Sequence, residues 1–110
     1  MIRGTTPTYI FPIPFDSANI EKLRITFEQG SVEITKTEDE CTFNNKEIIC
    51  RLTQQDTFSF EAGYIDVQIR GLTKNNEVIA TLPSKITCYD SLNEEVLVWV
   101  KRSELNSKNY

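Results

Sequence analysis

The sequence predicts an all-β fold, an immunoglobulin-like β-sandwich of about seven short antiparallel strands with one or two single-turn helices. Apolar and polar residues alternate along most of the chain, turn-forming residues recur about every 8 to 12 positions, and no long stretch has the helical period of about 3.6. A small barrel is the alternative architecture. A chain of 110 residues and 12.7 kDa has room for one hydrophobic core. We therefore expect one domain at residues 1–102 and a polar tail at residues 103–110.

The first strand is expected at residues 9–13, and the first hairpin at residues 23–34. In that hairpin the apolar residues keep one alternating phase on both sides of a Gln-Gly pair at residues 29–30. A two-residue loop there would place Phe27 opposite Val32, so that both strands share one apolar face.

A second hairpin is expected at residues 41–52, with its turn at residues 44–47. The alternation stays in phase across the turn and places Cys41 opposite Cys50, both facing inward. This pair could be a redox-labile disulfide or part of a metal site, or simply two small buried hydrophobic residues. We favour buried residues, because no lysine, arginine or helix start is evident that would lower a thiol pKa, and no further soft ligand is near in sequence. Cys88 has the same interpretation.

A third hairpin is expected to join residues 64–73 to residues 78–82, with Pro83 ending its ladder at an edge or bulge. A strand resumes at Ile86 and Cys88. On the core side, alternation predicts that residues 65, 67 and 69 face residues 78, 80 and 82.

Two short capped turns are expected between the strands, at residues 53–56 and 91–94. Each has Ser or Thr followed three positions later by an acidic residue, which is the pattern of a helix N-terminal cap. Phe58 and Phe60 alternate after the first turn, and we expect them to close one end of the core.

Residues 96–100 read Val-Leu-Val-Trp-Val and are apolar on both faces. We favour a last core strand with Trp99 filling the sandwich, over a strand that pairs with a neighbouring subunit. Prolines interrupt residues 9–15, which makes that stretch the better candidate for a swapped or added strand. The candidate interaction residues are Tyr9, Phe11, Phe15, Val98 and Trp99.

The composition argues against several classes of chemistry. The chain has no histidine, so triads with an imidazole base, histidine metal sites and histidine pH switches are excluded. Its four glycines are too far apart for a phosphate-binding loop. The acidic residues 38–40 lack the pattern of a calcium loop and are expected to be a solvated turn, as are residues 94–95. We predict no catalytic residue, no metal site and no cofactor, hence no enzyme.

The net charge of −4, with a single basic pair at residues 101–102, argues against nucleic-acid binding. No apolar run approaches the roughly 18 residues needed to cross a bilayer, and prolines interrupt the first apolar stretch, so neither a membrane span nor a signal peptide is expected. An odd number of cysteines without close spacing predicts reduced thiols of the cytosolic type.

Four segments carry a family resemblance: residues 1–8 (MIRGTTPT), 14–16 (PFD), 52–57 (LTQQDT) and 67–70 (VQIR). With them the chain resembles a family of small uncharacterised proteins of prophages and phages of Gram-positive gut bacteria, over residues 1–97. The resemblance implies a small protein of the phage structural gene module, found in the bacterial cytoplasm or in the virion. It transfers no catalytic or binding residue, and residues 99–110 depart from the usual ending.

Together these observations lead to one functional hypothesis and two alternatives. The hypothesis is a non-enzymatic structural or protein-interaction module, as a baseplate, tail or capsid-associated component, which binds a protein partner or itself. The first alternative is a carbohydrate-binding module, for which a surface cluster of Trp99 with two tyrosines would be needed. The second is a small regulatory protein that binds a basic partner through its acidic surface.

Overall fold

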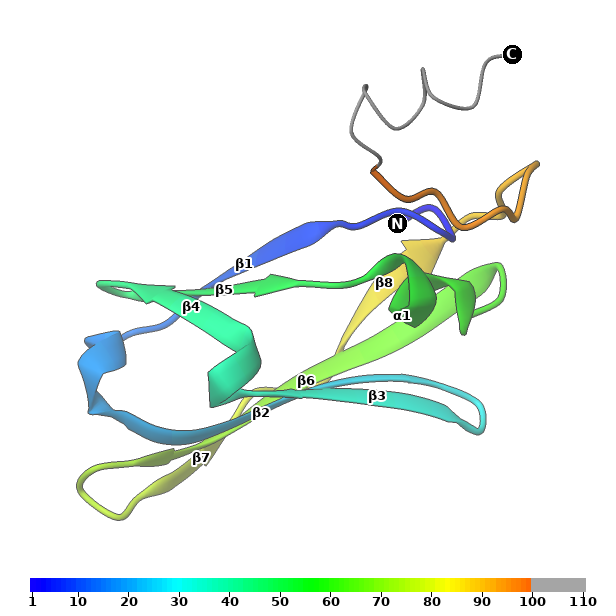
Figure 1. The fold of residues 1–110 in the computed structure, drawn as a ribbon. Helices are drawn as coiled ribbons and strands as arrows, with labels where there is room; N and C mark the ends of the chain where they lie inside the picture. Colours follow the sequence, from blue (N-terminus) through cyan, green and yellow to red (C-terminus); the bar gives the residue numbers. More distant parts are fainter. Residues whose placement is uncertain (100–110) are drawn as a thin grey trace.

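A computed structural model describes residues 1–99 and shows two antiparallel sheets that face each other (Figure 1). The expected all-β sandwich is therefore confirmed, and the barrel alternative is wrong. The predicted tail at residues 103–110, the basic pair at residues 101–102 and the last residue of the apolar run, Val100, lie outside the described residues.

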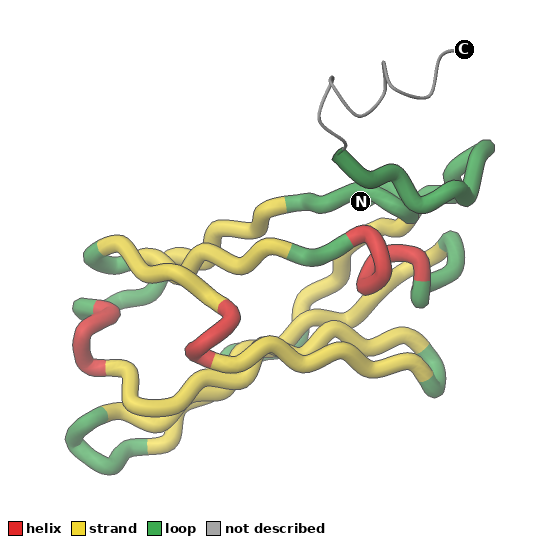
Figure 2. Tube along the Cα trace, in the orientation of Figure 1, coloured by secondary structure: helices red, strands yellow, loops and turns green. Residues whose placement is uncertain are grey.

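The smaller sheet has three strands in the order β1-β5-β4, and the larger sheet has five. The strands of the smaller sheet are β1 (Thr8–Pro12), β5 (Glu47–Arg51) and β4 (Cys41–Asn44). In the larger sheet β7 and β8 both pair with β6, and its strands are β3 (Val32–Thr37), β2 (Ile20–Gln29), β6 (Gly63–Thr73), β7 (Val78–Ala80) and β8 (Ser84–Cys88). Figure 2 shows the short helical turns that connect them, which are η1 (Ser17–Asn19), η2 (Glu38–Glu40) and α1 (Gln54–Phe58).

The order of the strands is that of an immunoglobulin-like domain. Strands β1, β5 and β4 take the places of strands B, E and D, while β3, β2, β6 and the β7–β8 pair take those of C′, C, F and G. Near the start of the chain, Ile2 forms a parallel bridge with Tyr89, just beyond β8. Within the described residues no strand lies beside the outer edge of β1, where strand A of a constant-type domain would pair.

The core lies between the two sheets and follows from the alternation in the sequence. In β2, for example, Leu23, Ile25 and Phe27 are at most 1% exposed, while the residues between them face outward or are only half-buried. Strand β5 of the other sheet contributes Ile48 and Cys50 to the same cluster. Each large apolar side chain so buried contributes about 1.5–3 kcal/mol, which makes this cluster the main stabilising feature.

The first hairpin differs from the prediction in its register. The loop consists of Gly30 and Ser31, so Phe27 lies opposite Ile34 and not opposite Val32. Gly30 has a φ of 58°, a left-handed conformation that glycine adopts without strain and that determines where the chain turns. Because the shift is two residues, every side chain keeps its predicted face.

For the third hairpin, the prediction of which residues face the core is wrong. Val78 and Leu82 were expected to face the core, but they are 66% and 89% exposed, and Ala80 is exposed as well. Ala80 lies opposite Arg70, on the outer face of β6, so Ile79 points inward instead. The ladder then shifts by one residue before β8, as the sequence around Pro83 predicts for a bulge.

The first of the two predicted capped turns is confirmed and the second is wrong. Thr53 accepts a hydrogen bond from the backbone N–H of Asp56 at 3.0 Å, and Asp56 accepts one from the N–H of Thr53 at 2.8 Å, which starts α1. Residues 91–94 form no helix. Phe60 is fully buried at the end of the core, as expected, whereas Phe58 is only half-buried.

Candidate interaction surface

Residues 96–99, called the apolar segment below, lie on the surface and belong to no strand. Their exposed fractions are 57% for Val96, 69% for Leu97, 76% for Val98 and 83% for Trp99. The expectation of a last core strand with a buried tryptophan is therefore wrong. Four successive exposed apolar side chains are unusual on a folded domain and are typical of a contact site.

The apolar segment is fixed to the sandwich by one side chain of α1. Gln54 accepts a hydrogen bond from the backbone N–H of Leu97 at 2.9 Å and donates one to the carbonyl oxygen of the same residue. The side-chain amide of Gln54 thus bonds to both the N–H and the C=O of Leu97, as a residue of a neighbouring strand would. No other residue of the segment is held in this way by Gln54. This leaves the side chains of the segment in water.

The outer edge of β1, at the side of the smaller sheet, is a second candidate contact site. Leu52 donates its N–H to the carbonyl of Pro7 at 3.0 Å, and Ile13 donates its N–H to the carbonyl of Lys46 at 2.9 Å. Since hydrogen bonding alternates along a strand, the odd-numbered residues of β1 bond to β5, and Thr8 and Ile10 direct their backbone groups to the open edge.

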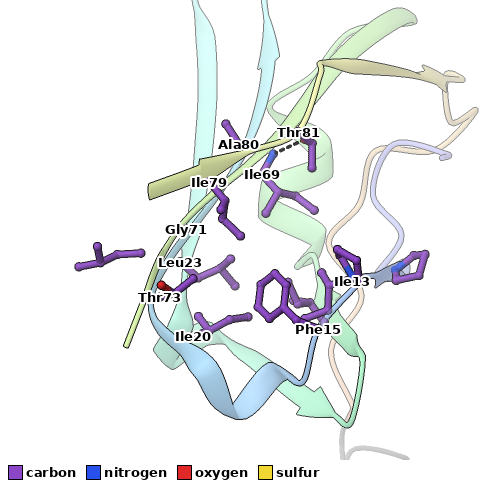
Figure 3. A pocket seen from close by; sticks show the side chains of 14 residues that line it. Ile13, Phe15, Ile20, Leu23, Ile69, Gly71, Thr73, Ile79, Ala80 and Thr81 are labelled. Atoms are coloured by element: carbon purple, nitrogen blue, oxygen red, sulfur yellow. Dashed lines mark hydrogen bonds between the residues drawn. The ribbon is translucent and has the colours of Figure 1, made fainter. Parts of the chain in front are cut away.

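A cavity of about 320 Å³ lies between the two sheets, in the half of the sandwich that contains η1 and β7. Figure 3 shows Ile13 and Phe15, from the stretch after β1, facing Ile69 of β6 and Ile79 of β7 across it. Almost the whole lining is apolar, with Thr73 and Thr81 as its polar residues. The two sheets therefore do not close completely against each other beside β1.

The five candidate interaction residues fall into two groups that the structure does not bring together. Tyr9 and Phe11 point inward from β1, with ring centroids 6.2 Å apart, and pack against the core; burial raises the pKa of the Tyr9 hydroxyl. Phe15 lines the cavity. Val98 and Trp99 lie with the apolar segment, near α1. The exposed apolar side chain on β1 is that of Ile10. Its outward orientation could have been predicted, because alternation along the strand places the residues next to Tyr9 and Phe11 on the opposite face.

Cys41 and Cys50 lie directly opposite each other on β4 and β5, in the register that the sequence predicts. Both are free thiols; Cys50 is buried and Cys41 is half-buried. The Cys50 thiol donates to the Cys41 sulfur, which lowers the pKa of Cys41, and the Lys36 ammonium lowers it further, against burial and the charge of Glu40. The same interaction raises the pKa of Cys50. The expectation that no lysine is placed near these thiols is wrong, because β3 brings Lys36 beside them.

Lys36 is also the main charged group that sequence reasoning missed. Its side chain is 10% exposed and its Nζ lies 2.7 Å from the carboxylate of Asp56, which is 17% exposed, while Glu40 is 3.7 Å away. Burial alone would lower the pKa of Lys36, but Asp56 and Glu40 outweigh it and raise that pKa. A lysine at a core position of an alternating strand was the only available signal.

Arg3 connects the start of the chain to α1 and to the stretch after β8. Its guanidinium donates to the carbonyls of Phe58 and Phe60, at 3.0 and 2.5 Å, and to the carboxylate of Glu94 at 2.6 Å. The neighbouring Gly4 donates its N–H to the hydroxyl of Thr57 at 2.8 Å. Residues 1–8 and 52–57, far apart in the sequence, thus contact each other.

The acidic turn at residues 38–40 forms η2 and has specific contacts. Glu38 accepts hydrogen bonds from the N–H of Leu23 and from Arg24, both at 2.9 Å, and the bond from Leu23 is the largest cause of its lowered pKa. Within residues 1–99 no three His, Cys, Asp or Glu side chains are grouped as metal ligands would be.

Two exposed tyrosines bear on the carbohydrate-binding alternative. Tyr64 is 67% exposed and lies opposite Thr87, and Tyr89 is 59% exposed and follows two residues later, so both belong to the outer face of the larger sheet. The Lys85 ammonium lies 5.9 Å from the centre of the Tyr64 ring. Trp99 lies two residues beyond Leu97, which Gln54 of α1 holds.

No family model, no curated protein and no solved structure matches the chain. Among the described residues, no helix has the length and apolar character needed to cross a bilayer.

Proposed function

We propose that this chain is a non-enzymatic structural or protein-interaction module of the phage type, and that the apolar segment, residues 96–99, is its contact with a protein partner. The observation that carries the proposal is the exposure of four successive apolar side chains, between 57% and 83%. The resemblance to phage proteins in residues 1–97 gives the context of an assembly component.

The energetics favour a contact at this place. Burying a large apolar side chain stabilises a complex by about 1.5–3 kcal/mol, so burying four of them offsets part of the free-energy cost of association. The two hydrogen bonds between the Gln54 side chain and the Leu97 backbone already restrain the segment, which reduces the conformational entropy lost on binding. A tryptophan in such a patch is also a frequent anchor of protein interfaces.

Substituting Leu97→Lys tests the proposal, with Leu92→Lys as its matched control. Leu92 is fully exposed but lies outside the apolar segment. The masses of the wild-type chain and of both variants are measured by light scattering after size exclusion over a wide concentration range. In parallel, binding to proteins of purified phage particles is measured. We expect association that Leu97→Lys abolishes and Leu92→Lys retains. A wild-type chain that is monomeric at every concentration and binds no virion protein would refute the proposal.

A carbohydrate-binding module is the second candidate, because two exposed tyrosines, Tyr64 and Tyr89, lie at neighbouring positions of one sheet face. Sugar rings stack on exposed aromatic side chains of this kind. Screening the chain against immobilised glycans tests this candidate: specific binding that Tyr64→Ala abolishes would support it, whereas absence of binding would remove it.

A further inference from the structure

We infer that Cys41 and Cys50 form a site of thiol–disulfide exchange with small-molecule disulfides, in which Cys41 attacks the small disulfide and Cys50 then closes a bond to Cys41. Such a site does not involve residues 96–99 and goes beyond the proposed function. The two residues are free thiols that lie directly opposite each other on β4 and β5. The sequence favours two inert buried residues because it shows no basic side chain near them, but β3 places Lys36 beside the pair.

The register of the strands allows a disulfide between the two residues. Lys46 and Leu52, which flank β5, bond through their backbones to the residues that flank β1, so the even-numbered residues of β5 direct their backbone groups toward β1. Cys50 therefore forms a non-hydrogen-bonded pair with Cys41, the kind of antiparallel pair whose Cα atoms are about 4.5 Å apart. A disulfide joins Cα atoms that are about 4.4–6.8 Å apart, so the bond closes without sliding the strands.

The two thiols differ in their access to solvent. Strand β4 is at the edge of the smaller sheet, whereas β5 lies between β1 and β4 (Figure 1). Cys41 is half-buried, and Cys50 is 0% exposed. A small disulfide in solution therefore reaches the sulfur of Cys41 and not that of Cys50. Cys88 is 2% exposed and lies opposite Gly63, so it is a buried thiol that faces no cysteine across its strand pair.

The charged groups around the pair favour one thiolate and one thiol. These groups are Lys36 of β3, Glu38 and Glu40 of η2, and Asp56 of α1. The hydrogen bond from the Cys50 thiol lowers the pKa of Cys41 most, and Lys36 lowers it further, while burial and the two glutamates oppose them. The same hydrogen bond and burial raise the pKa of Cys50. Because the thiolate is the nucleophile, Cys41 attacks first and Cys50 keeps its proton until the second step.

The exchange takes two steps. The Cys41 thiolate attacks one sulfur of the small disulfide, whose S–S bond breaks, so that one small thiolate leaves and a mixed disulfide remains at Cys41. Cys50 then loses its proton and attacks the Cys41 sulfur, and the second small thiolate leaves. The two protons of the protein thiols balance the two thiolates released. Two electrons pass from the protein to the small disulfide, which becomes two thiols.

Serine variants test the order of the two thiols. Each variant, shown to be folded by circular dichroism, is incubated with oxidised glutathione, quenched with acid and mapped by mass spectrometry. In Cys50→Ser we expect glutathione to remain attached to Cys41, because the resolving thiol is missing. Attachment to Cys50 in Cys41→Ser, and to Cys88 as the internal control, should be at least about tenfold slower, because both thiols are buried. The wild-type chain should release both glutathione molecules and contain a Cys41–Cys50 bond.

Lys36→Met tests whether Lys36 is a positioning residue for the thiolate, with Lys36→Arg as the control that keeps the charge. Without the ammonium the pKa of Cys41 should rise, and the pH profile of glutathione attachment in Cys50→Ser should move to higher pH. Near neutral pH the rate should fall about threefold for each pH unit of this movement, because the thiolate fraction falls about tenfold while its nucleophilicity increases roughly threefold. Lys36→Arg should keep the original profile.

The inference is wrong if glutathione attaches to Cys41 no faster than to Cys88, or if Cys50 in Cys41→Ser reacts as fast as Cys41 in Cys50→Ser. Should a serine variant fail to fold, iodoacetamide labelling of the wild-type chain takes its place: Cys41 must be alkylated before the other two thiols, and equal rates would overturn the inference. A pH profile that Lys36→Met leaves unchanged would refute the role of Lys36. Residues 96–99 take no part in these measurements, so their outcome leaves the proposed function untouched.

Discussion

Replacing Lys36 by methionine should destabilise the protein more than the loss of a lysine from an exposed surface ion pair would. The Lys36 ammonium lies 2.7 Å from the Asp56 carboxylate, and the two side chains are only 10% and 17% exposed. Methionine has a similar length and no charge, so Lys36→Met keeps most of the packing and leaves the carboxylate without its cation. Asp56 retains the hydrogen bond from the N–H of Thr53 at 2.8 Å.

The expected cost lies between two limits. Breaking a fully buried ion pair costs about 3–5 kcal/mol, and breaking an exposed pair costs about 0–1 kcal/mol. Because Lys36 and Asp56 are mostly but not fully buried, we expect about 2 kcal/mol, which corresponds to a decrease in melting temperature of roughly 10 °C for a domain of this size.

The pH dependence of the free energy of unfolding provides a second test of this ion pair. Burial alone would raise the pKa of Asp56, but the hydrogen bond and charge of Lys36, together with hydrogen bonds from Thr53, outweigh it, so the folded-state pKa lies below the ordinary value. Stability from this shift is fully present above the unfolded pKa of about 4 and is lost as the pH falls through the folded pKa. The difference between wild type and Lys36→Met should therefore be largest near neutral pH and shrink below about pH 4.

Urea unfolding followed by circular dichroism at several pH values measures both effects. Lys85→Met is the matched control, because Lys85 forms a 2.8 Å pair with Asp66 in which both side chains are more than half exposed. We expect this control to change stability by less than about 1 kcal/mol. The reasoning is refuted if the two variants are equally stable, or if the deficit of Lys36→Met grows as the pH is lowered.

Three further outcomes follow from the structure. Diamide, which takes up the two thiol hydrogens, should join Cys41 to Cys50, and this short loop should raise stability by about 2–3 kcal/mol; peptide mapping that finds either residue paired elsewhere would contradict the register. Gly4→Ala should cost about 1–3 kcal/mol, since Gly4 has a φ of 80° and an added Cβ would lie 2.3 Å from the Phe58 ring; an unchanged melting temperature would argue against this contact. Acrylamide should quench the fluorescence of Trp99, the single tryptophan, almost as it does in the unfolded chain at concentrations where the protein is monomeric, and strong protection there would contradict its exposure.

Much of the fold was predictable because the period of two in a strand assigns side chains to faces without knowledge of the partner strand. Leu23, Ile25 and Phe27 face the core as expected, and the pairing of Cys41 with Cys50 follows from the in-phase alternation around one tight turn. The capping box at the start of α1 was equally readable, since it depends on four consecutive residues.

The errors arose where local patterns do not determine the partner. Two-residue loops at residues 29–30 and 30–31 are both compatible with the first hairpin, and only the backbone of Gly30 selects the second. For residues 78–82 the sequence has apolar residues on both faces, so alternation could not tell that Ile79 points inward. The proximity of Lys36 to Cys41 required β3 and the β4–β5 hairpin to be placed in space.

For the candidate interaction surface, the sequence by itself determined which residues are apolar enough to matter, including residues 96–99 and the proline-interrupted stretch at residues 9–15. It could not determine their exposure, because a run that is apolar on both faces suits a buried strand and an intermolecular strand equally well. That choice was made by the tertiary structure: the other strands form the core without residues 96–99, the apolar segment is left in water, and β1 keeps an open edge. The physical reason is that burial and strand pairing are long-range properties, which depend on how much apolar surface and how many backbone groups the rest of the chain has already satisfied.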